Sequence, residues 1–181
     1  MIRQSIAKRY AKGLFAVGEK DGQYKVYLAE LENILGLFEK EQRLKKALML
    51  PLLEVQKRKE LLSDTMRLSG TSLPLANMLT MLLERNRMSY LPIIRDVYSD
   101  LVDDKEDRAR GTVWTAFPLD STLLKRIEEA LKERLNKKEI ILSAIEDKSL
   151  IGGVKVAVKG TIIDGSVKKQ LETLKENILK E

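Results

Sequence analysis

The spacing of hydrophobic residues predicts helices throughout roughly the first hundred residues of the chain. The first predicted helix has two apolar sides rather than one. One side carries Ile6, Tyr10, Gly13 and Val17, which recur at i, i+4, i+7 and i+11. The other side carries Ala7, Ala11, Leu14 and Phe15. Helical spacing then recurs in five further stretches, at residues 24–38, 44–48, 55–66, 72–85 and 91–101.

Strand periodicity follows a charge-dense segment, residues 103–110, which either continues the last helix or links two domains. Beyond it the pattern predicts strands at residues 111–117, 140–145, 150–158 and 161–163. Helices are predicted at residues 124–135 and 167–178. We therefore expect an α+β protein, in which a six-helix bundle over residues 1–104 precedes a smaller α/β domain over residues 105–181. That second domain should contain a short sheet and two helices.

Two residue types that carry much of protein chemistry are missing from the sequence. Without cysteine, the chain forms no disulfide, no thiolate nucleophile and no thiolate metal site. Without histidine, it lacks the most frequent general base and the most frequent transition-metal ligand. We therefore expect a protein that is not an enzyme and that uses neither a metal nor a cofactor.

A net charge of +6 suggests nucleic-acid binding, but the charges are interleaved. Residues 1–110 carry 20 basic and 16 acidic side chains, and residues 111–181 carry 13 and 11. The basic triplet at residues 57–59 lies between Glu54 and Glu60, which is typical of a solvated helix face with mixed charge. We expect no nucleic-acid partner.

The first 18 residues contain four basic side chains and no acidic one, which superficially resembles a transit peptide. The same residues form the two-sided helix described above, so a working helix is the favoured interpretation. Apolar runs elsewhere in the chain are too short to span a bilayer, and we expect no direct membrane insertion.

Three short features of the sequence have residue types that occur at sites of chemistry. Residues 159–161 (KGT) contain the letters of a phosphate loop in the wrong order, at a predicted hairpin turn. Two glycines at 152–153, inside a predicted strand, favour a bulge or a close approach by another backbone over ligand binding. Asp147 and Asp164 each lie in a turn-like setting, where capping is favoured over a catalytic carboxylate pair.

The strongest functional signal is apolar surface on two of the predicted helices. Besides the two-sided first helix, the helix at 72–85 carries Met78 and Met81 beside its leucine stripe. Such helices are either central to the bundle or form a groove for a partner's amphipathic helix, where flexible methionine side chains suit adaptable contacts. Glycine inside a helix costs about 0.5–1 kcal/mol relative to alanine. Gly13 favours the groove, because a close helix approach would account for that cost.

Three parts of the chain carry a resemblance to a known family. Residues 7–15 (AKRYAKGLF) are similar to an opening A-x-x-Y-A-x-A-L-F segment, with Gly13 in place of the usual alanine. Residues 82–91 (LLERNRMSYL) resemble an L-x-x-N-x-R-x-x-x-L stretch, and residues 147–153 (DKSLIGG) with 163–167 (IDGSV) resemble its most characteristic pair. On these segments, which span most of its length in the right order, the chain resembles the delta subunit of bacterial F-type ATP synthases. The mitochondrial counterpart is the oligomycin-sensitivity-conferring protein.

This resemblance implies a non-catalytic stator subunit, which links the catalytic alpha/beta head to the peripheral stalk and resists rotor torque during proton-driven ATP synthesis. Residues 1–104 would bind the N-terminal helix of an alpha subunit, and residues 105–181 would contact the b-type stalk subunits. One copy per complex is expected, at the cytoplasmic face of the bacterial plasma membrane. The alpha-binding groove is expected on Ile6, Tyr10, Gly13, Val17, Met78, Met81 and Arg85. A structural motif is expected at Gly152, Gly153, Asp164 and Gly165.

Overall fold

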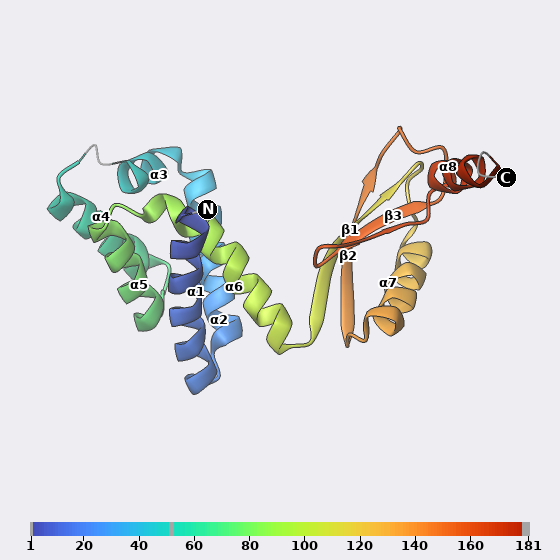
Figure 1. Ribbon diagram of the computed structural model, residues 1–181. Coiled ribbons are helices and arrows are strands. Elements are labelled where there is room, and N and C mark those ends of the chain that lie inside the picture. Colours follow the sequence, from blue (N-terminus) through green and yellow to red (C-terminus); the bar gives the residue numbers. More distant parts are fainter. Residues whose placement is uncertain (1, 51–52, 179–181) are drawn as a thin grey trace. The chain divides into compact units, whose positions relative to one another are not determined.

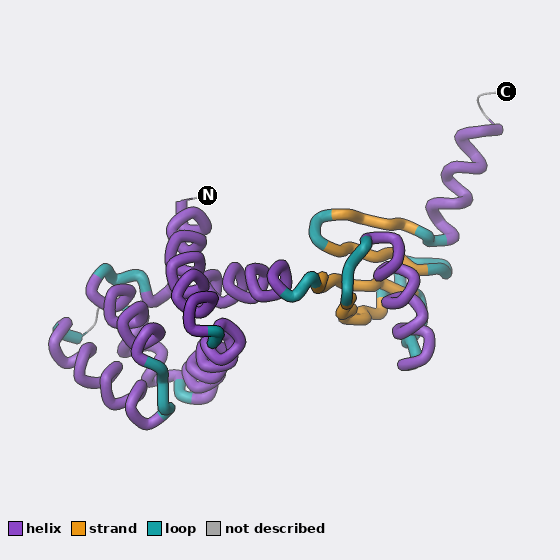
Figure 2. The backbone as a smooth tube through the Cα atoms, turned by 90° about the horizontal axis from the view of Figure 1, so that it is seen from below, coloured by secondary structure: helices purple, strands orange, loops and turns teal. Residues whose placement is uncertain are grey.

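The computed structural model describes residues 2–50 and 53–178 of the 181-residue chain. The chain divides into two compact units, Met1–Val102 and Asp103–Glu181. Figures 1 and 2 show that the first unit is helical and that the second contains the strands. Within the described residues there are eight α-helices and one four-stranded mixed sheet, so the expected α+β class is confirmed. The division between the units falls inside the last helix of the first half, just before the expected boundary.

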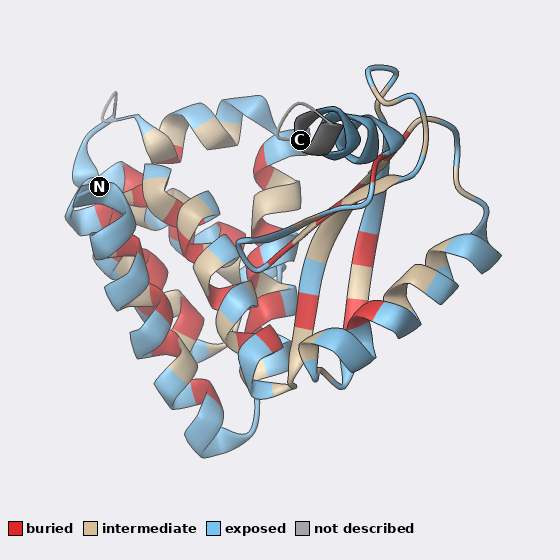
Figure 3. Ribbon diagram, turned by 45° about the vertical axis from the view of Figure 1, so that its right-hand side comes forward, coloured by how far each residue is buried: buried red, intermediate tan, exposed pale blue. Residues whose placement is uncertain are grey.

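The helices of the first half lie where the hydrophobic spacing predicts them. They are α1 (Ile2–Asp21), α2 (Tyr24–Lys40), α3 (Gln42–Met49), α4 (Val55–Leu68), α5 (Leu73–Glu84), the 3₁₀ helix η1 (Met88–Tyr90) and α6 (Leu91–Lys105). Their apolar sides meet in a common core, which appears as the buried stripes along the helices in Figure 3. Leu31, Leu79 and Ile94, from α2, α5 and α6, are among its fully buried members.

Small residues let α1 approach its neighbours closely. The side of α1 that faces the core carries Ala7, Ala11, Leu14 and Gly18. A methyl group added at Gly18 would lie only 2.8 Å from the Cα atom of Tyr24 in α2 and 3.0 Å from the hydroxyl oxygen of Tyr98 in α6. That hydroxyl donates a hydrogen bond of 3.1 Å to the carbonyl oxygen of Tyr24. Gly18 therefore marks a place where only a hydrogen atom fits between the helices.

The interpretation of residues 57–59 as a solvated face is wrong for Arg58, whose side chain is only 1% exposed. Its Nη2 atom donates to the carbonyl oxygen of Leu48 at 2.7 Å, and its Nη1 atom donates to Oδ1 of Asn86 at 2.9 Å. Asn86, directly after α5, has a left-handed backbone with φ of 51°. The buried guanidinium thus connects the end of α3 to the turn that follows α5. The mixed charges around Arg58 in the sequence gave no indication of this role.

The second unit contains a sheet with the strand order β2-β1-β3-β4. Its strands are β1 (Arg108–Thr115), β2 (Glu139–Glu146), β3 (Val154–Val158) and β4 (Thr161–Asp164), and its helices are α7 (Ser121–Leu135) and α8 (Val167–Ile178). β1 pairs with β2 in parallel, because α7 lies between them in the chain, whereas β3 is antiparallel to both β1 and β4. Asp120 caps α7, since its carboxylate accepts from the backbone N–H of Leu123 at 2.7 Å.

The core of this unit lies between α7 and one face of the sheet. It consists of Ala109, Val113, Leu131, Ile140, Leu142, Val156 and Val158. The turn between β3 and β4 is the tight one expected at Lys159 and Gly160, which both have positive φ, 46° and 79°. Two neighbouring left-handed residues are the geometry that joins antiparallel strands with a two-residue loop.

For residues 103–110 the first of the two expected alternatives holds, because α6 continues to Lys105. β1 then begins at Arg108, before the expected start of that strand at residue 111. The charges of this segment are paired: Asp103, only 2% exposed, accepts from Nε of Arg110 at 2.7 Å and lies 3.3 Å from Nη2 of Arg108. The third strand is also shorter than expected, since β3 begins at Val154 and leaves the two glycines before it outside the sheet.

Candidate protein-binding site

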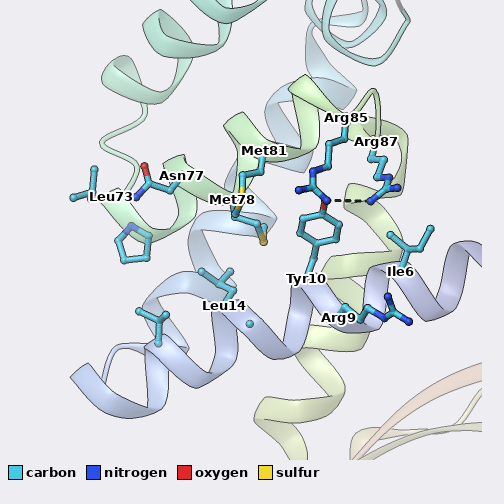
Figure 4. Close-up of a pocket in the computed structure, with 13 residues that line it drawn as sticks. Ile6, Arg9, Tyr10, Leu14, Leu73, Asn77, Met78, Met81, Arg85 and Arg87 are labelled. Atoms are coloured by element: carbon cyan, nitrogen blue, oxygen red, sulfur yellow. Dashed lines mark hydrogen bonds between the residues drawn. The ribbon is translucent and has the colours of Figure 1, made fainter.

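The first unit has an apolar groove of about 850 Å³ between α1 and α5, shown in Figure 4. All seven residues predicted for the groove lie along it, namely Ile6, Tyr10, Gly13, Val17, Met78, Met81 and Arg85. Six further residues complete its lining, namely Arg9, Leu14, Leu73, Pro74, Asn77 and Arg87. The structure therefore brings together both predicted sets of side chains.

The two-sided sequence of α1 explains why this groove remains open. Each of the four predicted groove residues of α1 directly precedes a residue of its core side, so the two sides lie next to each other around the helix. Val17 is 41% exposed and Met81 is 45% exposed, although both are large and apolar. A methyl group added at Gly13 would meet no atom within 4 Å. The helical unit therefore leaves Gly13 and Val17 on this side of α1 uncovered, although Tyr10 packs partly against the core.

The floor of the groove belongs to the core of the unit. Met78 and Leu14 are each only 4% exposed, and both are members of the core cluster. A charge at Met78 would therefore disturb the core as well as the groove. Its spacing on α5 could not distinguish the floor from the rim, because Met78 and Met81 lie on neighbouring turns of one helix side.

Basic side chains gather at one end of the groove. Figure 4 shows Arg9, Arg85, Arg87 and Tyr10 at this end, whereas Leu73 lies at the other. Nη1 of Arg87 donates a long hydrogen bond of 3.4 Å to the hydroxyl of Tyr10. Sequence reasoning found Arg85 but missed the two other arginines. Arg9 lies off the apolar spacing of its helix, and Arg87 precedes η1, where helical spacing gives no information.

The second unit brings together the predicted structural motif. Val167 N–H donates to the carbonyl oxygen of Gly152 at 3.0 Å, and Gly165 N–H donates to that of Val154 at 2.9 Å. Gly153 has φ of 78°, and a methyl group added to it would lie 2.4 Å from the carbonyl oxygen of Gly165. The close approach by another backbone, predicted from the glycine pair, is confirmed.

Asp164 forms a local turn rather than a helix cap. Its Oδ1 atom accepts from the backbone N–H of Ser166 at 3.0 Å, and hydrogen bonding to Ser166 holds the pKa of this carboxyl below its usual value. The capping contact at the start of α8 comes instead from Ser166, whose Oγ atom accepts from Lys169 N–H at 3.2 Å. The motif is structural, because it holds the segment that leads into β3 against the segment that leads into α8.

A known protein family matches nearly the whole chain. The sequence profile described as ATP synthase delta (OSCP) subunit matches residues 6–178. The chain belongs to the ATP synthase delta (OSCP) subunit family. It is 35% identical over 178 residues to ATP synthase subunit delta of Desulfatibacillum aliphaticivorans, covering 98% of this chain and 97% of that protein. It is 32% identical over 179 residues to the subunit delta of Shouchella clausii, covering 99% and 98% respectively.

A solved structure shares the fold of this delta-family chain. A chain in the cryo-EM structure of the Toxoplasma gondii mitochondrial ATP synthase hexamer superimposes with a TM-score of 0.70 at 23% identity. That match covers 96% of this chain and 97% of the other. As a member of the delta family, the protein is a structural rather than a catalytic subunit of ATP synthase. In the part of the chain that the structure describes, no helix has the length and apolar character to cross a membrane.

Proposed function

We propose that the groove between α1 and α5 binds the N-terminal amphipathic helix of an alpha subunit. In this proposal residues 1–104 act as a six-helix module that holds the catalytic head, and residues 105–181 hold the b-type subunits of the peripheral stalk. One copy serves each complex, at the cytoplasmic face of the bacterial plasma membrane. The observation that carries the proposal is the groove itself, an apolar surface of the helical unit that its own core leaves uncovered.

The dimensions of the groove suit a short helix. Ile6 and Val17 lie at either end of its α1 wall. Their separation in the chain corresponds to ~16 Å of helix, or about three turns, at 1.5 Å per residue. An apolar helix side laid along this wall would bind mainly by surface burial, at about 25 cal/mol per Å² before the costs of association are deducted. Affinity of this kind needs no chemistry from the subunit, only a rigid surface at each of its two attachment sites.

The stalk contact is assigned to the second unit because that unit exposes apolar surface of its own. Leu171 and Leu174 on α8 are 53% and 56% exposed. A smaller cavity of about 470 Å³ lies between α7 and the sheet, with Ile127 and Val156 in its lining. An isolated helix face of this kind is stabilised by contact with a partner helix.

A peptide-binding experiment tests the alpha contact. The full chain is titrated with a synthetic peptide of the alpha N-terminus, and Met81→Asp and Gly13→Asp are compared with the wild type. Met81 is exposed and open space surrounds Gly13, so we expect affinity to fall at least tenfold while the melting midpoint changes little. Leu68→Asp and Gly36→Asp are matched controls, because they place the same charge on helices outside the groove. Normal binding by the folded fraction of both groove variants would refute the proposal.

The division of roles is tested separately in the full chain. The double variant Leu171→Asp with Leu174→Asp should lose b-subunit binding and keep the affinity for the alpha peptide. If b binding persists unchanged in this variant, α8 does not carry the stalk contact.

A further inference from the structure

The charge distribution around the groove between α1 and α5 makes its two ends different. The 13 lining residues include three arginines and no acidic residue. Arg9, Arg85 and Arg87 all lie toward the end at which α1 begins and α5 finishes, as Figure 4 shows. The basic surface extends along α1, because the first 18 residues of the chain contain no aspartate or glutamate.

The three guanidinium groups have no anionic partner within the described part of the chain. The only contact that the structure gives any of their nitrogens is the 3.4 Å hydrogen bond from Arg87 to the neutral hydroxyl of Tyr10. Glu84, the carboxylate nearest in sequence, is already engaged, since its Oε1 atom lies 2.6 Å from Nζ of Lys59. Arginine presents five N–H donors in a fixed plane, so most of the donors at this end of the groove are available.

An apolar helix that covered these arginines would remove part of their hydration. Burial of a charged group is costly unless it is paired, whereas an arginine–carboxylate contact is both charge-assisted and directional. A helix with a carboxylate at the corresponding end of its apolar stripe avoids that cost. A helix with lysine or arginine there is repelled.

We infer that the arginine end of the groove, formed by Arg9, Arg85 and Arg87, recognises acidic side chains at one end of the occupant's apolar helix. This inference rests on the proposed alpha contact and adds the chemistry that sets the register of the bound helix. Burial along α1 and α5 supplies most of the affinity, and the arginines select an acidic segment and accelerate its association. The absence of acidic residues from the first 18 positions thereby has a function in binding, since it keeps competing carboxylates away from this end of the groove.

Charge-removing variants test this inference. Arg85→Gln with Arg87→Gln is titrated with a peptide of the alpha N-terminus at low and high salt, beside a second peptide in which every aspartate and glutamate is an amide. We expect the double variant to bind the acidic peptide about tenfold more weakly at low salt, with a smaller difference at high salt. The amide peptide should bind the wild type as weakly as the acidic peptide binds the double variant. It should also bind the wild type and the double variant with the same affinity. Lys12→Gln is the matched control, because it removes a charge from α1 outside the groove.

The outcomes separate this inference from the proposal on which it rests. If the amide peptide binds as tightly as the acidic one, or if Lys12→Gln has the same effect as the arginine variant, charge recognition is refuted. The groove itself still stands in that case, provided that Met81→Asp loses binding. If the wild type binds neither peptide, the alpha contact fails and this inference fails with it.

Discussion

Gly153 provides a sharp test of the structural motif in the second unit. It has a left-handed backbone, and the position that a methyl group would occupy lies 2.4 Å from the carbonyl oxygen of Gly165 and 3.0 Å from Cα of Ser166. Both neighbours are backbone atoms, so they cannot move aside as a flexible side chain would. Gly153→Ala should therefore separate the two segments that meet before β3 and before α8.

The expected cost is the sum of two effects. A left-handed backbone costs an alanine about 1 kcal/mol or slightly more. Relief of the clash requires the two segments to separate, which weakens the hydrogen bonds from Gly165 to Val154 and from Val167 to Gly152. Each such bond contributes about 1 kcal/mol. The free energy of unfolding of the second unit should fall by about 2–4 kcal/mol in total.

Gly160→Ala is the matched control. Gly160 has almost the same backbone, with φ of 79°, but a methyl group there would meet no atom within 4 Å. Gly160→Ala should lower the free energy of unfolding by only about 1 kcal/mol, which is the cost of the left-handed backbone alone. Trp114, the single tryptophan, lies in β1, so its fluorescence during urea titration reports the unfolding of the second unit. Equal losses in the two variants would show that the contact with Gly165 carries no energy and that our account of the motif is wrong.

Three further predictions concern stability. Gly18→Ala should destabilise the helical unit by more than about 2 kcal/mol, because the new methyl group meets the backbone of α2 and a tyrosine hydroxyl of α6. Gly36→Ala has open space around it and should stabilise α2 by about 0.5–1 kcal/mol. Thermal melting followed by circular dichroism measures both changes. Arg58→Ala should cost about 3 kcal/mol in the same assay, through a cavity and two lost hydrogen bonds, and a loss below 1 kcal/mol would contradict this role. The pKa of Asp164 is lowered in the folded state, so the stability that its carboxylate contributes is complete above the unfolded value near 3.8 and is lost as pH falls through the folded value. Asp164→Asn should therefore make the urea midpoint, followed by Trp114 fluorescence, depend less on pH in acid. An unchanged pH dependence would contradict this.

The helices were predictable because each has an apolar side that repeats at helical spacing. The groove was predictable for a related reason: α1 has two apolar sides, and a small unit can bury only one of them. Spacing alone could not separate the groove floor from its rim, so it placed Met78 in the groove but did not show that this side chain is almost fully buried. It also gave no information about Arg87, whose position depends on the turn after α5 rather than on a helical period.

Charge patterns were the least reliable guide to structure. Arg58 lies between lysines and glutamates in the sequence, yet it is buried and donates to oxygens from two other segments. The dense charge of residues 103–110 left a helix end and a linker as alternatives, and the segment forms the end of a helix and the start of a strand. In both places the deciding interactions join residues that sequence reasoning could not pair. Gly152 and Gly153 were correctly linked to a close backbone approach, but the same approach ends the strand that was predicted to contain them.

The arrangement of α1 explains how one helix can serve folding and binding without conflict. Its core side is built from small residues that allow close contact with α2 and α6, and its groove side is left open by the unit itself. An occupant of the groove therefore needs no rearrangement of the core, and the binding surface is already formed before the partner arrives. Under the proposed function, a subunit that holds its partner under torque benefits from this separation. Force on a helix bound there would act on an interface whose floor, at Leu14 and Met78, is part of the packed core.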